Sequence, residues 1–441
     1  MSYAAAVEGL FALSGELHAT PGKPRRKFDL DQMRALAEAL GNPQLKFPSV
    51  LIAGTNGKGS TAATLASILQ TGGYRTGLYS SPHLTRVNER VRINGEDITD
   101  DDFAAYYFRV DDCARRLVAE GRLKSLPSFF EAMTALGFLA FTEKGIDIAV
   151  LEVGMGGRLD ATNIVEPLVS VITDISLDHM EWLGNTITEI SREKAGILRQ
   201  NGVLVTLPQH PEANQSIGEA AVALGVRGVN AAEYIPARGT DESAYSLSVL
   251  GETVEIASPL TGAHQQRNVA LAIATAVEIS NYHGYKLSAR HIAEGVRVTR
   301  WPGRFERFHR AGRADVILDV GHNPAGAWAL RSALSRLEPT PRTMTMVFGC
   351  LKDKALDEMA QILFPLFSTI VLTEVSSPRT AALAQLRAAA DATGAKARTA
   401  ANPQQALTEA LALTPADGVV VVAGSVYLVG ELRGLLQEPA A

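Results

Sequence analysis

The octapeptide Ala53-Gly54-Thr55-Asn56-Gly57-Lys58-Gly59-Ser60 follows the apolar run Val50–Ile52 and precedes a helical pattern over Thr61–Gln70. A strand, a glycine-rich turn and a helix N-terminus together form a phosphate-binding arrangement. Glycines let backbone N–H groups converge on phosphate oxygens, and a lysine reaches the terminal phosphates. The octapeptide therefore predicts a nucleotide-phosphate site.

The match to the general P-loop pattern is imperfect. That pattern has Gly, four residues, Gly-Lys and then Ser or Thr. Here Ile52 occupies the first glycine position, and Gly59 separates Lys58 from Ser60. The alternative is a helix-capping turn without a ligand. One Ser or Asn suffices for a cap, whereas this turn uses three glycines and a lysine, so we favour the nucleotide site.

Composition restricts the class of protein. A chain of 441 residues is too long for one core and predicts two or three domains. Cys113 and Cys350 lack CxxC spacing, which argues against a disulfide framework or a structural zinc site. A net charge of -5 gives no general attraction to nucleic acid or membranes. The N-terminus lacks a convincing signal peptide and no apolar run has membrane-spanning length, so we expect a cytoplasmic protein, most simply a monomer.

Strand and helix patterns alternate along the chain, which predicts an α/β fold with parallel sheets. We expect a P-loop ATPase-type domain over 1–298, a linker over 299–305 and a smaller Rossmann-like domain over 306–441. The second domain has no GxGxxG sequence, so no dinucleotide is assigned. The expected strands are 50–52, 74–80, 146–151, 168–173, 203–206, 316–320, 344–348, 369–373 and 418–423, with a hairpin over 245–257. The expected helices include 61–70, 101–120, 128–144, 262–280, 325–337, 356–363, 381–390 and 427–435.

Polar side chains follow three of the expected strands: Ser81, Glu152 and His179. Because ligands bind outside the carboxyl ends of parallel strands, we expect these side chains beside the octapeptide. An acid that ends a central strand beside a phosphate loop is a common Mg²⁺ ligand. The structural alternatives are a simple turn, a helix cap and a hydrogen-bonded histidine, respectively. By spacing alone, Lys194 is a surface lysine.

A series of motifs extends over nearly the whole chain. They are GTNGKGS (54–60), SPHL (81–84), LEVGMGGRLDATN (151–163), EKAGI (193–197), GAHQQRN (262–268), WPGR (301–304) and DVGHNP (319–324). This series resembles the folylpolyglutamate synthase/dihydrofolate synthase family, which is related to the Mur peptide ligases. The chain departs from the family pattern at Met155, where the family has Leu, and at Gly321, where it has Ala.

The resemblance implies ATP as cofactor. The position of Asn268 meets the adenine, Arg267 approaches the phosphates, and Arg304 contacts ATP. Asp319 and His322 contact ATP or the incoming glutamate. The implied ATP-binding residues are Gly54, Thr55, Asn56, Gly57, Lys58, Gly59, Ser60, Arg267, Asn268, Arg304 and Asp319. The implied catalytic residues are Lys58, Lys194, Asp319 and His322.

The resemblance also implies two Mg²⁺ sites, held by Ser81, Glu152, His179 and Lys194. Lys194 matches a lysine that is often carbamylated near the second magnesium. A carbamate replaces the cation by an oxygen ligand, which is what magnesium prefers. Ser60 could face the metal as well.

The acceptor residues implied by the resemblance are Phe129, Phe130, Arg158, Asp160 and His322. Both rings lie at the start of a helix, where family members contact the pterin, and ordinary core packing is the alternative for each. Asp160 could accept hydrogen bonds from the pterin. The basic run Arg25–Lys27 could fold over an anionic acceptor or form a solvated surface.

The implied reaction is ATP-dependent addition of L-glutamate to dihydropteroate, to a reduced folate, or to both, through an acyl phosphate. We favour the bifunctional enzyme over a polyglutamate synthase alone. A Mur-type ligase is disfavoured by the Lys-Gly-Ser order, by SPHL and by the lack of a uridine-nucleotide domain before residue 49. A different kinase or NTPase leaves DVGHNP without a role, and a nonenzymatic nucleotide-binding module is the weakest alternative.

Overall fold

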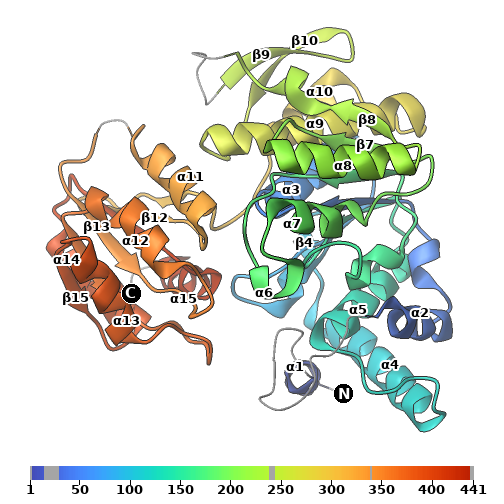
Figure 1. Ribbon diagram of the computed structural model, residues 1–441, viewed down its shortest axis with the longest axis horizontal. Helices are drawn as coiled ribbons and strands as arrows, with labels where there is room; N and C mark the ends of the chain where they lie inside the picture. The colour runs from blue at the N-terminus through green and yellow to red at the C-terminus, as the bar shows by residue number, and fades with distance from the viewer. Residues whose placement is uncertain (1, 14–28, 238–243, 338–339, 438–441) are drawn as a thin grey trace. The chain divides into compact units, whose positions relative to one another are not determined.

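The computed structural model describes residues 2–13, 29–237, 244–337 and 340–437. The chain divides into two compact units, which are coloured blue to yellow and orange to red for the most part (Figure 1). Unit 1 comprises Met1–His83, Val87–Pro259 and Gln266–Arg300. Unit 2 comprises Leu84–Arg86, Leu260–Gln265 and Trp301–Ala441. Two short segments from the first half and middle of the chain therefore belong to unit 2.

Unit 1 is built on an eight-stranded sheet in the order β4-β3-β2-β5-β1-β6-β7-β8. The strands from β2 to β8 in this order are parallel, and β3 and β4 add to one edge in antiparallel orientation. β1 and β5 are buried over their whole length, which explains their continuous apolar runs. The strands are β1 (Ser49–Ala53), β2 (Thr76–Tyr79), β3 (Val91–Ile93), β4 (Glu96–Asp97), β5 (Ile148–Glu152), β6 (Val169–Ile172), β7 (Val203–Thr206) and β8 (Arg227–Asn230).

Helices pack against this sheet, and a separate hairpin pairs β9 (Ala244–Val249) with β10 (Glu252–Ala257) (Figure 1). The helices are α1 (Tyr3–Ala12), α2 (Leu30–Ala39), α3 (Lys58–Thr71), α4 (Asp100–Ala119), α5 (Phe129–Glu143), α6 (Met180–Leu183), α7 (Ile187–Ala195), α8 (Pro211–Ala223), α9 (Ala263–Tyr282) and α10 (Ala289–Arg297). Within the described ranges, every helix is too short or too polar to cross a bilayer.

Helix α3 begins three residues before the expected start at Thr61. Gly57 precedes it with φ +87°, a left-handed conformation that favours glycine, and so turns the chain into the helix. Lys58, Gly59 and Ser60 consequently form its first turn, with Ser60 buried. The second half of the octapeptide is therefore a helix N-terminus, where the helix dipole favours anions.

Unit 2 contains a six-stranded sheet in the order β11-β12-β16-β13-β14-β15, parallel except for β11 at one edge. Its strands are β11 (Glu306–Phe308), β12 (Asp315–Leu318), β13 (Met344–Phe348), β14 (Thr369–Leu372), β15 (Ala397–Thr399) and β16 (Val419–Ala423). Its helices are α11 (Pro324–Leu334), α12 (Leu356–Leu363), α13 (Leu383–Ala392), α14 (Pro403–Leu413) and α15 (Val426–Gln437). Two apolar clusters, one for each face of the sheet, form the core of this unit.

The expected α/β fold with parallel sheets is confirmed. The sequence pattern did not indicate the short strands β3, β4, β8, β11 and β15. These strands are short and at least partly exposed, so they lack the apolar runs that mark the buried strands. Helices α10 and α14 were also not expected.

Candidate active site

The first half of the octapeptide is held by the segment that follows β6. The amides of Thr55 and Asn56 both donate to the Asp174 carbonyl oxygen, at 2.9 and 3.2 Å. The Thr55 hydroxyl donates to the Ser176 carbonyl at 3.0 Å, and the Asn56 amide group donates to the Ser176 hydroxyl at 3.0 Å. The loop shape is thus set by β6, the neighbour of β1 in the sheet. The sequence analysis did not assign a role to Asp174 or Ser176.

Two glycines of the loop allow close approach to other parts of unit 1. A Cβ atom at Gly54 would lie 1.8 Å from the Thr173 hydroxyl oxygen. A Cβ atom at Gly57 would lie 2.1 Å from Asn268 Oδ1. Asn268 is buried, and its carbonyl accepts a hydrogen bond from the Thr61 hydroxyl at 3.3 Å. The residue predicted to meet adenine therefore lies directly against the phosphate loop.

Replacing Gly57 by alanine should weaken ADP binding and lower the melting temperature. The substitution combines an unfavourable φ with the contact to Asn268, and we expect a loss of about 1–3 kcal/mol in stability. Gly73 is a matched control, because its φ is +88° but a Cβ atom there would have open space. Gly73→Ala should show only the smaller backbone cost, measurable by thermal unfolding. Equal effects of the two substitutions would contradict the crowding at Gly57.

Two lysines meet at one carbonyl group of the loop. Lys58 Nζ donates to the carbonyls of Gly54 and Thr55, at 3.1 and 3.3 Å. Lys194 Nζ donates to the same Gly54 carbonyl at 2.7 Å. Lys194 is only 3% exposed, so it is not the surface lysine that its spacing suggested. Burial, and then the nearby charge of Lys58, hold the pKa of Lys194 well below its usual value. The unprotonated amine is therefore more favoured here than in an exposed lysine.

Ser81 and Glu152 lie together at the carboxyl edge of the sheet. The Ser81 amide donates to Glu152 Oε2 at 3.2 Å, and Glu152 is buried at the end of β5, opposite Ile52 of β1. His179 has φ +51° and precedes α6, with its amide donating to Asp178 Oδ1 at 2.9 Å. Among the residues that the structure describes, no three His, Cys, Asp or Glu side chains form a ready-made metal cluster. A site for Mg²⁺ here would have to combine the Glu152 carboxylate with ligands of other kinds, such as a serine hydroxyl.

The glycine-rich segment after Glu152 packs tightly against protein groups. A Cβ atom at Gly154 would lie 2.4 Å from the Phe130 ring, and one at Gly157 would lie 2.8 Å from the Glu193 carbonyl oxygen. These contacts bring the segment against α5 and α7. The second contact places the segment beside Lys194.

Asp160 and Arg158 have partners within the same region. The Asp160 carboxylate accepts bonds from the amides of Met155 and Thr162, both at 3.0 Å, and from the Thr162 hydroxyl at 2.6 Å. Burial raises the pKa of Asp160. Arg158 binds Glu193 Oε1 at 2.8 Å with its side chain 54% exposed. These contacts hold the segment in place. The roles of Asp160 and Arg158 in acceptor binding remain predictions.

Phe129 and Phe130 occupy different environments. Phe130 is buried and packs edge-on against Tyr79, with ring centroids 5.9 Å apart. Phe129 is half-buried, with the Arg90 guanidinium 5.0 Å above its ring. Arg90 Nε also donates to His83 Nδ1 at 2.9 Å. Burial and the Arg90 charge lower the pKa of His83 to about 3, so this histidine is neutral.

Phe129 thus belongs to a small cluster of side chains with Arg90 and His83, and His83 lies two residues after Ser81. The exposed ring of Phe11 completes this cluster, 5.3 Å from Phe129. The sequence analysis noted Phe129 but missed Phe11, His83 and Arg90. His83 lies within the SPHL motif, which was the available signal.

Unit 2 carries the predicted residues Arg304, Asp319 and His322. The buried Asp319 carboxylate accepts bonds from the amides of Gly321 at 2.8 Å and Phe305 at 3.0 Å, and so joins the segment after β12 to the start of β11. Burial raises the pKa of Asp319, against the opposing charges of Arg304 and His264. His322 Nδ1 lies 2.9 Å from the Val320 carbonyl oxygen. Arg304 and His264 thus lie close enough to Asp319 to oppose this shift of its pKa. His264 was not assigned a role from the sequence.

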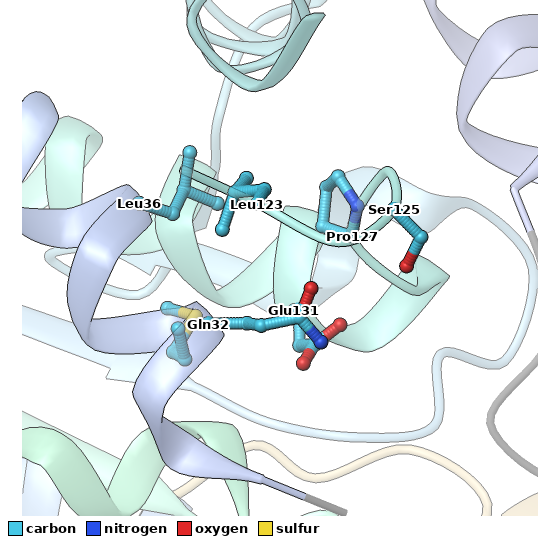
Figure 2. A pocket seen from close by; sticks show the side chains of 7 residues that line it. Gln32, Leu36, Leu123, Ser125, Pro127 and Glu131 are labelled. Carbon is cyan, nitrogen blue, oxygen red and sulfur yellow. The ribbon is translucent and has the colours of Figure 1, made fainter. Parts of the chain in front are cut away.

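A small, partly open pocket lies between α2, the segment before α5 and the start of α5 (Figure 2). It is lined by Gln32, Met33, Leu36, Leu123, Ser125, Pro127 and Glu131. Each of the predicted site residues lies elsewhere, so the pocket is not part of the candidate site.

The fold and the motifs define a Mur-ligase type of enzyme. The Mur ligase middle domain matches residues 52–276, and the Mur ligase glutamate ligase domain matches residues 303–426. Folylpolyglutamate synthase of Lacticaseibacillus casei is 33% identical over 414 residues, covering 92% of this chain and 94% of that protein. Dihydrofolate synthase/folylpolyglutamate synthase of Bacillus subtilis is 32% identical over 423 residues, covering 92% and 95%. The chain belongs to the folylpolyglutamate synthase/dihydrofolate synthase family.

Solved structures agree with this assignment. A Mycobacterium tuberculosis folylpolyglutamate synthase complexed with ADP has a TM-score of 0.89 at 32% identity, covering 100% of this chain and 99% of that one. Escherichia coli FolC in complex with DHPP and ADP has a TM-score of 0.84 at 30% identity, covering 99% and 98%.

Proposed function

We propose that this protein is an ATP-dependent ligase that adds L-glutamate to dihydropteroate and to reduced folates. The observation that carries the proposal is the loop at the end of β1, where Lys58 lies in the first turn of α3 and its Nζ contacts the Gly54 carbonyl. A cation at a helix N-terminus suits the triphosphate of ATP. Relatives of this chain have been solved with ADP, which supports ATP as the cofactor.

The chemistry proceeds in two balanced steps. A carboxylate oxygen of the acceptor attacks the γ-phosphorus of ATP, the bond to the bridging oxygen breaks, and ADP leaves. The amine of glutamate then attacks the acyl phosphate carbon, phosphate leaves, and the amine loses a proton as the amide forms. The protein contributes positioning and charge neutralisation, with Lys58 at the phosphates. Asp319, His322 and Arg304 of unit 2 are proposed to contact ATP or glutamate.

Mg²⁺ is proposed to bind through Ser81, Glu152, His179 and a carbamate on Lys194. A buried carboxylate next to a serine, at the edge where the phosphate loop begins, fits an oxygen-liganded cation. Bound there, magnesium would neutralise phosphate charge. The number of magnesium sites, proposed to be two, can be counted by metal titration in the presence of an ATP analogue.

The acceptor is proposed to bind near Phe129. A half-buried ring with a guanidinium above it offers one stacking face and a positive charge for an anionic, aromatic acceptor. Curated relatives carry both activities in one protein, and the relative solved with DHPP and ADP supports an acceptor site of this kind. The basic run Arg25–Lys27, a second candidate for this role, lies outside the described residues.

The proposed function is tested by phosphate release from ATP, with each acceptor crossed against amino acids. We expect release only when glutamate is present with dihydropteroate or with a reduced folate. If the protein extends a reduced folate but forms no dihydrofolate from dihydropteroate, it has the polyglutamate synthase activity alone. Release with a uridine-nucleotide acceptor would favour the Mur-type alternative. The cytoplasmic, monomeric state proposed here is checked by cell fractionation and light scattering.

Replacing Phe129 by leucine should raise the KM for the acceptor by up to about tenfold with little change in the KM for ATP, because ring stacking is worth about 0.5–1.5 kcal/mol. Phe130→Leu is the matched control, since that ring is buried against Tyr79 and Gly154. It should instead lower the melting temperature. A KM effect on the acceptor in Phe130→Leu but not in Phe129→Leu would reverse the assignment.

A further inference from the structure

Arg267, on the first turns of α9, is joined to Asp174 by a bidentate ion pair. Arg267 Nε lies 2.9 Å from Asp174 Oδ2, and Nη2 lies 2.6 Å from Oδ1. Nη2 also donates to the Pro208 carbonyl at 3.0 Å. Both side chains are about one-third exposed, at 29% and 35%. Paired, parallel hydrogen bonds of this kind fix orientation as well as adding energy.

The main chain of Asp174 makes a second set of contacts. Its carbonyl oxygen accepts the amides of both Thr55 and Asn56. The carboxylate of Asp174 therefore binds α9, while its carbonyl binds the phosphate loop. Asn268, the next residue of α9, lies against Gly57, the residue that follows Asn56 in the loop. Two consecutive residues of α9 thus act on adjacent positions of the loop, one through Asp174 and one directly.

We propose that Arg267 and Asp174 are a positioning pair that fixes the shape of the phosphate loop, and that Arg267 acts on the nucleotide through Asp174 rather than by touching its phosphates. The proposal rests on the proposed function, in which this loop binds ATP. It differs from the role implied by the family resemblance, where Arg267 approaches the phosphates. Because the amides of Thr55 and Asn56 bind Asp174, phosphate contacts are left to the second half of the loop, from Gly57 to Ser60.

Asp174→Asn separates the two roles of Arg267. If the pair positions the loop, loss of the carboxylate weakens ADP binding about tenfold, as loss of one charge-assisted contact would. If Arg267 contacts phosphate directly, the same substitution releases its guanidinium, and ADP binds as well as before or more tightly. Arg267→Gln weakens ADP binding in both cases and therefore does not discriminate alone.

The experiment measures ADP binding by calorimetry for Asp174→Asn, Arg267→Gln and the double variant. We expect similar losses in all three, because removing either partner breaks the same pair, so the two effects do not add. The KM for ATP should rise by a larger factor than kcat falls. A general loss of stability would not change KM and kcat in this unequal way. Wild-type ADP affinity in Asp174→Asn, or additive losses in the double variant, would overturn the proposal.

Hydrogen exchange of the 53–60 segment provides a readout that needs no nucleotide. In Asp174→Asn the amides of Thr55 and Asn56 should exchange faster, by about tenfold. If the wild-type protein binds no ADP, the proposed function fails, yet this measurement still tests the action of the pair on the loop. Unchanged exchange would contradict the pair's role.

A matched control is the Arg297–Glu294 pair of α10. It is also bidentate, at 2.7 and 2.6 Å, and its side chains are 62% and 47% exposed. Glu294→Gln should leave ADP affinity and exchange of the 53–60 segment unchanged. If Asp174→Asn fails to fold, Arg267→Lys replaces it, because it keeps the charge but loses the paired contact. An intermediate loss of ADP affinity is then expected, and wild-type affinity would overturn the proposal.

Discussion

Lys58→Ala is expected to reduce kcat by about 100-fold or more while the protein stays folded. Removal of a single group that stabilises charge in the transition state typically has an effect of this size. The described contacts of Lys58 Nζ are two carbonyls of its own loop, so the charge is not needed for core packing. The effect is measured by phosphate release under saturating substrates, with thermal unfolding as the test of folding.

Lys144→Ala is the matched control for Lys58→Ala. Lys144 caps α5 and binds Asp102 at 2.8 Å, with its side chain one-third exposed. Its loss should leave turnover near the wild-type value, because an exposed ion pair contributes little. Near wild-type turnover in folded Lys58→Ala would remove the basis for placing ATP phosphates at this loop.

Lys194→Ala is expected to lose activity to a similar extent, by about 100-fold, because it removes a proposed oxygen ligand of the metal. Lys194 is buried beside the Gly54 carbonyl and Lys58. The lowered pKa favours the unprotonated amine, which can attack carbon dioxide, lose a proton and become an anionic carbamate. The negative charge of the carbamate would then be attracted to Lys58.

A carbamate on Lys194 has consequences that an unmodified lysine at this position would not have. Wild-type protein freed of carbon dioxide should lose activity and regain it on addition of bicarbonate. With ¹³C-bicarbonate, a carbamate signal should appear in the wild type and be missing in Lys194→Ala. Short carboxylates should partly restore Lys194→Ala. An unmodified Lys194 in a structure with both magnesium ions bound would contradict the prediction.

The sequence predicts much of this site because parallel strands end at one edge of a sheet. That rule places Ser81 and Glu152 together, and the structure joins them by a hydrogen bond. The start of α3 was harder to predict, because the left-handed conformation of Gly57 lets the helix begin three residues early.

Contacts between distant parts of the chain could not be predicted in this way. Asp174 and Arg267 are 93 residues apart, and only the fold brings the start of α9 to the segment after β6. The burial of Lys194 depends on how closely Gly157 lets the preceding segment approach α7. The resemblance to a family supplied roles for several residues, but it did not reveal which partners hold them.

The two edges of the eight-stranded sheet bear on how the protein behaves at high concentration. An unpaired strand can recruit another chain and start aggregation unless it is short or charged. One edge is β4, which has two exposed residues, both acidic: Glu96 and Asp97. The other is β8, whose Arg227 binds Glu278 and stacks against Tyr282. Both edges of this large sheet are therefore poor templates for intermolecular pairing, a property useful to a protein that must keep a broad parallel sheet in solution.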